Sequence, residues 1–96
     1  MSISRDLAQL FEKGIADFSA GRYAAAAEIF KSVLARAPGF APGHNVHGLA
    51  LAGLGRMPEA LASYEAALRL DPSFAAPYIN RATLWRDQGD TAAALA

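Results

Sequence analysis

Residues 48–72, GLALAGLGRMPEALASYEAALRLDP, decide the fold of this 96-residue chain. The stretch combines small residues, one ring and a helix-ending proline, at Gly48, Gly55, Ala60, Tyr64, Ala67 and Pro72. A shift of 34 positions toward the N-terminus finds a matching set, Gly14, Gly21, Ala26, Phe30 and Pro38, with Val33 in place of Ala67. The same shift toward the C-terminus finds Ala82, Gly89 and Ala94. This pattern predicts an internal repeat of 34 residues.

Local signals predict two helices in each repeat. In the central one, Pro42 stands in the first turn of a small and apolar segment over residues 41–54. Gly55 comes next as a stop, because glycine takes the left-handed conformation that closes a helix. A second helix begins around Pro58 and ends before Pro72, since the residue that precedes a proline is disfavoured in the helical region. The unit is therefore a helical hairpin.

The flanking repeats are expected to have the same plan. Ser4 is a suitable N-cap for a first helix that runs to about Ala20, and residues 24–36 form the second. In the third repeat we expect a helix over residues 75–88, a turn at Gly89 and a last helix that has barely begun, with Asp90 as its N-cap.

The small residues have a mechanical purpose in this scheme. Two antiparallel helices can cross closely only where no large side chain separates them, so we expect Gly48 to face Ala60. Tyr64 and Ala67 are then expected to fill the space between one repeat and the next.

Taken together, these markers make the chain resemble the tetratricopeptide repeat (TPR) family. The resemblance covers residues 7–96 and implies a single all-α domain, a right-handed solenoid of antiparallel helix pairs with repeats at about 7–40, 41–74 and 75–96, the last one truncated. The chain departs from the family at four positions that usually hold Leu or Trp, which here are Lys13, His44, His47 and Arg81. The short final segment suggests a fragment of a larger TPR protein, and its turns resemble those of TPR appendages of bacterial enzymes.

Composition narrows the classes of function. Nine basic and nine acidic residues cancel, which leaves no charge surplus for a phosphate backbone, so nucleic acid is not an expected partner. The absence of cysteine removes disulfides and thiolate chemistry and fits a cytoplasmic protein. No secretory signal is visible at the N-terminus, and the apolar residues 46–54 are too few to span a bilayer, so no membrane partner is expected.

Catalytic and metal sites are not indicated. His44 and His47 are three apart on one predicted helix, as two metal ligands could be, but no acidic residue or cysteine stands at helical spacing beside them. Packing between helices explains the pair better. The serines have no histidine at a spacing that suggests a triad. We therefore expect no enzyme, no metal and no cofactor.

In the TPR family, the first helices of successive repeats line a concave groove that holds a peptide. The resemblance places the groove here at Phe11, Ile15, Phe18, Asn45, Val46, Leu49, Ile79, Asn80, Thr83 and Arg86. Co-chaperone TPR domains grip a terminal carboxylate with Lys, Asn and Arg. The matching places here hold no cation, so that clamp is absent; they are Phe11, Ile15, Val46, Ala76 and Asn80.

The predicted function is a scaffold that binds a peptide or a partner segment of unknown identity in an apolar groove. Two alternatives stay open. The chain could form homo-oligomers, for example a homodimer through the groove or the truncated end, or it could be a non-catalytic TPR appendage of a bacterial glycosyltransferase or methyltransferase.

Overall fold

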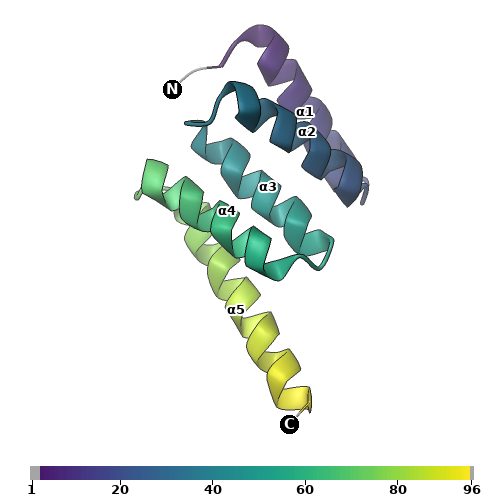
Figure 1. The fold of residues 1–96 in the computed structure, drawn as a ribbon, viewed down its shortest axis with the longest axis vertical. Coiled ribbons are helices and arrows are strands. Elements are labelled where there is room, and N and C mark those ends of the chain that lie inside the picture. Colours follow the sequence, from purple (N-terminus) through teal and green to yellow (C-terminus); the bar gives the residue numbers. More distant parts are fainter. Residues whose placement is uncertain (1–2, 96) are drawn as a thin grey trace.

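A computed structural model describes residues 3–95 of the backbone and the side chains of residues 3–89. All regular structure in this part of the chain is helical (Figure 1). The five helices are α1 (Arg5–Ser19), α2 (Tyr23–Arg36), α3 (Ala41–Gly53), α4 (Met57–Leu70) and α5 (Ala75–Leu95). The first four agree closely with the predicted helices.

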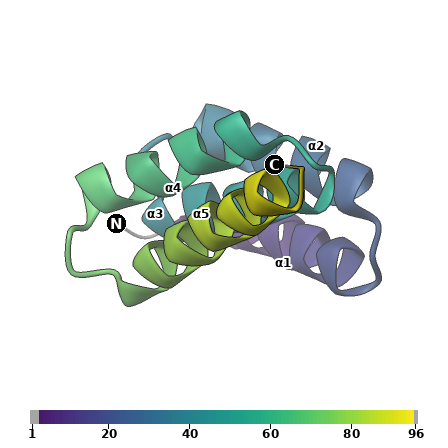
Figure 2. The same cartoon turned by 90° about the horizontal axis from the view of Figure 1, so that it is seen from below.

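The helices form one elongated array in which each helix contacts its neighbours. α1 packs on α2, α2 on α3, α3 on α4 and α4 on α5, while α3 also touches α1 and α5. Figure 2 shows α2 and α4 on one side of the array and α1 and α5 on the other. The array measures 49 × 29 × 17 Å. The all-α arrangement of antiparallel helix pairs is therefore confirmed.

The first helix begins and turns as its sequence predicts. The Ser4 side chain accepts a hydrogen bond from the backbone N–H of Leu7 at 3.2 Å, which satisfies one of the free donors in the first turn. After α1 and α3 the chain turns at Gly21 and Gly55, whose φ angles of 80° and 78° lie in the left-handed region. Both predicted glycine stops are confirmed.

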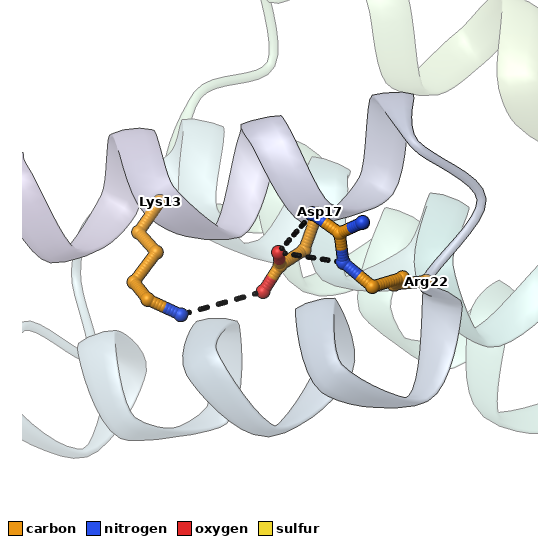
Figure 3. A network of polar contacts seen from close by, with 3 residues as sticks. All are labelled: Lys13, Asp17 and Arg22. Carbon is orange, nitrogen blue, oxygen red and sulfur yellow. Dashed lines mark hydrogen bonds and ion pairs between the residues drawn. The ribbon is translucent and has the colours of Figure 1, made fainter.

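A buried carboxylate reinforces the first of these turns (Figure 3). Asp17, near the end of α1, accepts two hydrogen bonds from the guanidinium of Arg22, from Nε at 3.1 Å and from Nη2 at 2.9 Å. The ammonium of Lys13 lies 3.7 Å from the other carboxylate oxygen. The Asp17 side chain is nearly buried, so these two cations compensate for the water that it has lost.

Glycine and an aromatic ring meet inside each of the first two hairpins. A Cβ atom added to Gly14 would stand 2.5 Å from a ring carbon of Phe30, and one added to Gly48 would stand 2.5 Å from a ring carbon of Tyr64. The backbone carbonyl oxygen of Ala60 lies 3.1 Å from the Cβ position built on Gly48, so Gly48 faces Ala60 as predicted. The expectation for Tyr64 was incomplete: its ring shares a core cluster with Leu84 of the next repeat, as expected, but it also lies over Gly48 of its own hairpin.

The predicted turn at Gly89 is wrong. α5 continues through Gly89 and Asp90 to Leu95, so Asp90 is not an N-cap. The turns at Gly21 and Gly55 each lead into a helix long enough to pack back and bury an alanine, Ala26 or Ala60. Residues 90–95 instead continue the helical path of α5 beyond Gly89.

Candidate functional site

The predicted groove residues lie on α1, α3 and α5, and four of them pack against one core cluster. Phe11, Ile15, Phe18 and Val46 are half-buried and rest against a core cluster formed by Ala26, Ala27, Phe30 and Ala50. The ring of Phe11 lies 5.7 Å from that of Phe30 and 5.1 Å from that of Phe40, measured between centroids. These four side chains are held in place by the core and leave little apolar surface free for a ligand.

Two asparagines link α3 to α5 across the same face. The side-chain amide of Asn80 donates a hydrogen bond of 2.9 Å to the side-chain oxygen of Asn45. Asn45 is only 6% exposed, so its oxygen depends on this bond in place of water. The side-chain oxygen of Asn80 takes no part in this bond and can accept from a ligand.

A hollow of about 250 Å³ lies between α3 and α5, at the start of α4. Three of the predicted groove residues, Leu49, Asn80 and Thr83, share its wall. The other lining residues are Ala52, Gly53, Met57, Leu84 and Asp87. The wall thus combines aliphatic and thioether carbon with amide, hydroxyl and carboxylate groups, a mixture that is common in ligand-binding hollows.

Sequence reasoning omitted Gly53, Met57 and Leu84 from this site. Leu84 comes four residues after Asn80, so the helical period could have placed it on the same side of α5. Met57 and Gly53 come from the ends of two different helices that the turn at Gly55 brings together. No period within one helix reveals such a contact.

The remaining predicted residues extend the site outward along α5. Ile79 is 65% exposed, the largest exposed fraction among the large apolar side chains of the described residues. Arg86 is also exposed, and its Nε lies 3.9 Å from a carboxylate oxygen of Asp87. These two side chains extend the face on its solvent side.

A larger hollow, of about 460 Å³, lies at the other end of the array. It is formed by the start of α1 and the end of α2, with the lining residues Ile3, Ser4, Leu7, Arg36, Ala37, Pro38 and Gly39. None of the predicted groove residues belongs to it. It is an end surface of the first hairpin, separate from the face formed by α1, α3 and α5.

The two histidines occupy structural positions. His44 makes a 2.8 Å hydrogen bond through Nε2 to the carbonyl of Pro38. Burial lowers the pKa of His47, and the nearby His44 and Arg56 lower it further, while Glu59 of α4 acts in the opposite direction. Within the described residues, no group of three His, Cys, Asp or Glu side chains could hold a metal ion.

An aromatic cluster stands on another side of α5. The guanidinium carbon of Arg81 lies 4.7 Å from the ring centroid of Trp85 and 5.6 Å from that of Tyr78, so the cation sits between two rings. Tyr78 donates its hydroxyl to the carbonyl of Pro72 at 2.9 Å. The Nε of Arg81 is buried and has no hydrogen-bond partner within the described part of the chain.

The chain repeats a helical hairpin of one length, and each repeat contacts only the next one along the chain. The first helices of the repeats together form one face. These features define the class of helical solenoid proteins. The profile of the tetratricopeptide repeat family matches residues 11–73 and 45–96. The chain belongs to the tetratricopeptide repeat family. No catalytic family is evident among the matches.

Solved TPR domains superpose closely on the chain. The TPR2B domain of yeast Sti1, in its pHsp70 complex, is 30% identical with a TM-score of 0.86, and the match covers 96% of this chain and 74% of that one. The TPR2AB domain of yeast Sti1, in its pHSP90 complex, is 30% identical with a TM-score of 0.83, and the match covers 97% of this chain and 36% of that one.

The TPR domain of Sgt2 from Aspergillus fumigatus is 19% identical with a TM-score of 0.86, covering 93% of this chain and 59% of that one, and supports the fold alone. The comparison with curated proteins found no match. Among the described residues, no helix has the length and apolar character needed to cross a membrane.

Proposed function

We propose that this chain is a protein-binding module that holds a segment of another polypeptide on the face formed by α1, α3 and α5. The observation that carries the proposal is the hollow between α3 and α5, which has apolar walls at Leu49 and Met57 and polar groups at Asn80 and Thr83. An apolar side chain of the ligand would enter the hollow, while the Asn80 amide oxygen would accept from its backbone. The exposed Ile79 would add apolar contact beside it.

The chemistry of the face favours a ligand segment without a required terminal carboxylate. The solved Sti1 relatives are complexes with pHsp70 and pHSP90. At the places that match the carboxylate clamp of co-chaperone TPR domains, this chain has the uncharged residues Phe11, Ile15, Val46, Ala76 and Asn80. A carboxylate there would lose water without gaining a cation, so we expect an internal, largely apolar segment as the ligand.

We further propose that residues 1–96 act as one TPR domain with repeats at about 7–40, 41–74 and 75–96, and that it functions in the cytoplasm as a scaffold. The continuous run of packing from α1 to α5 supports a single unit. The absence of cysteine supports a reducing compartment.

The test is a selection of ligands from a displayed library of random dodecapeptides, with affinity measurements on the enriched peptides. Thr83→Arg places a long cation in the hollow and should weaken binding by about tenfold or more. Thr83 is exposed, so the substitution should leave the fold intact, unlike a change at the half-buried Phe18.

Ser32→Arg is the matched control. Ser32 is an exposed hydroxyl on α2 that donates to the carbonyl four residues earlier, as Thr83 does on α5. Binding should survive this substitution. Selected peptides that bind the Thr83→Arg and wild-type chains equally well, or a selection that enriches no peptide, would contradict the proposed groove.

A further inference from the structure

The hollow between α3 and α5 has a sulfur atom in its wall. Met57, the first residue of α4, is one of the lining residues and is partly exposed, so it meets solvent in the hollow. It is the one sulfur-bearing side chain of the described residues, because the chain has no cysteine and its other methionine, Met1, lies outside them. A thioether is also a side chain that mild oxidants convert into a polar one.

The surroundings of Met57 are apolar. Its side chain packs against a core cluster at the junction of α3, α4 and α5, formed by Leu51, Ala60, Tyr64 and Leu84. A thioether suits this place because it is flexible, polarisable and nearly apolar. This part of the wall therefore stays apolar only as long as the sulfur carries no oxygen.

The polar groups of the hollow are poorly suited to pair with an oxygen atom on that sulfur. The hydroxyl of Thr83 already donates to the carbonyl of Ile79, at 3.0 Å. One N–H of the Asn80 amide already donates to Asn45, at 2.9 Å. The carboxylate of Asp87 accepts hydrogen bonds and donates none. These side chains offer such an oxygen one N–H of Asn80 at most, and water must supply the rest.

We propose that oxidation of Met57 by hydrogen peroxide switches off peptide binding in the hollow. One peroxide oxygen is transferred to a lone pair of the sulfur and the O–O bond breaks. The remaining OH takes up the proton of the transferred oxygen and leaves as water, so the thioether is oxidised to a sulfoxide and the peroxide is reduced. A thiol-dependent sulfoxide reductase returns the thioether, with two thiols oxidised to a disulfide and the oxygen released as water. The inference rests on the proposed function, because it concerns the regulation of the same hollow.

Binding weakens because the apolar side chain of a ligand would displace the water around the new oxygen. Such a side chain makes no hydrogen bond, so the sulfoxide oxygen would be buried and unpaired in the complex. In the free chain the same oxygen faces solvent in the hollow. The cost therefore falls on binding, and we expect the affinity to fall by about tenfold or more.

The probe for this switch is a dodecapeptide selected on the wild-type chain that contains no methionine, cysteine or tryptophan and that loses affinity for Thr83→Arg. The full 96-residue chain is treated with hydrogen peroxide, and mass spectrometry of its tryptic fragments locates the added oxygen at Met57. The affinity for the peptide should then fall by about tenfold or more. Incubation with sulfoxide reductases for both sulfoxide epimers and dithiothreitol should restore it.

Two variants of the same residue test the role of the sulfur. Met57→Leu keeps Met1, so peroxide still has a methionine to oxidise, but the affinity of this variant after treatment should equal its own affinity before treatment. Met57→Gln places a polar amide of similar length in the wall and should weaken binding without peroxide. Circular dichroism of the oxidised wild-type chain should show the helix content of the untreated chain.

Four results overturn the inference. Equal affinity of the untreated and oxidised wild-type chains overturns it and leaves the proposed groove standing. A fall in the affinity of oxidised Met57→Leu as large as that of the wild type also overturns it, because another residue would then be responsible. Loss of helix content in parallel with loss of binding assigns the effect of peroxide to folding. A selection that enriches no peptide overturns the proposed groove and this inference together.

Discussion

At the scale of single residues, a glycine leaves room for an aromatic ring inside each of the first two hairpins. Gly14 receives Phe30 and Gly48 receives Tyr64, and a Cβ atom in ideal geometry would lie 2.5 Å from the ring in both places. Neither glycine has a positive φ, so space, not backbone conformation, requires glycine at these two sites. The two hairpins use one packing device twice.

Gly48→Ala should therefore destabilise the protein by about 1–3 kcal/mol, because the added methyl group forces the buried Tyr64 ring to move. Urea unfolding monitored by circular dichroism measures this cost. In a Tyr64→Leu background, where the ring is gone, the same substitution should cost much less. Equal costs in both backgrounds would show that the ring is not the obstacle.

Much of this contact could be predicted from the sequence, but not the direction in which the ring points. The 34-residue period identified Gly48, Ala60 and Tyr64 as contact residues. It assigned Tyr64 to the space between repeats, because spacing along one helix shows which side a residue occupies without showing which neighbour lies nearest. The ring in fact fills the room left by Gly48, with Leu84 beyond it.

At the scale of helices and turns, three glycines with equivalent sequence positions have two different structures. Gly21 and Gly55 turn the chain with positive φ, whereas Gly89 lies inside α5. A period can place a glycine at the same point in each repeat, but it does not show whether the chain turns there or stays helical, because glycine accepts both conformations. Ala26 and Ala60 are fully buried where the helices after the two turns pack back.

One substitution should thus have opposite effects at two of these sites. Gly55→Ala should destabilise the protein by about 1–2 kcal/mol, since alanine is strained at a φ of 78°. Gly89→Ala should stabilise α5 by about 0.5–1 kcal/mol, because Gly89 is helical and an added Cβ would meet no atom within 4 Å. Thermal melts and helicity by circular dichroism measure both. A loss at Gly89 as large as that at Gly55 would show a turn at both positions.

The sequence could predict which three helices form the candidate site, but not which of its side chains are open to a ligand and which are covered. Leu49, Asn80 and Thr83 meet in the hollow as neighbours on one face should. Phe11 and Val46 share that face and are largely covered, because side chains from α2 and from the turn that precedes α3 reach under them. How far a side chain from another helix reaches is set by the angle at which helices cross, which no period reports.

At the scale of the whole molecule, contacts pass only from each helix to its near neighbours. α5 is held by α4 and, more weakly, by α3, and within the described residues it makes no contact with α1 or α2. Stability in such an array is a sum of local terms, so one end can open while the other stays folded.

Leu84→Ala should expose this behaviour. Leu84 is buried against Leu51, Ala60 and Tyr64, and its truncation should cost about 2–5 kcal/mol at the junction of α5 with the rest. Hydrogen exchange should accelerate throughout α5 and leave α1 and α2 nearly unchanged. Thr83→Ala, at the exposed neighbouring position, is the control and should change little. Uniform acceleration along the whole chain would indicate a single cooperative unit.

The neighbour-only contacts also give the molecule a mechanical character. A pull on its two ends would act along the 49 Å axis, and no tie between α1 and α5 in the described part of the chain resists it. The array would lengthen as each helix interface yields a little, and it would separate first at α5, which has less contact with its neighbours than α1 has. Elastic compliance of this kind would let the array adjust its curvature to the length of a segment bound in the proposed groove.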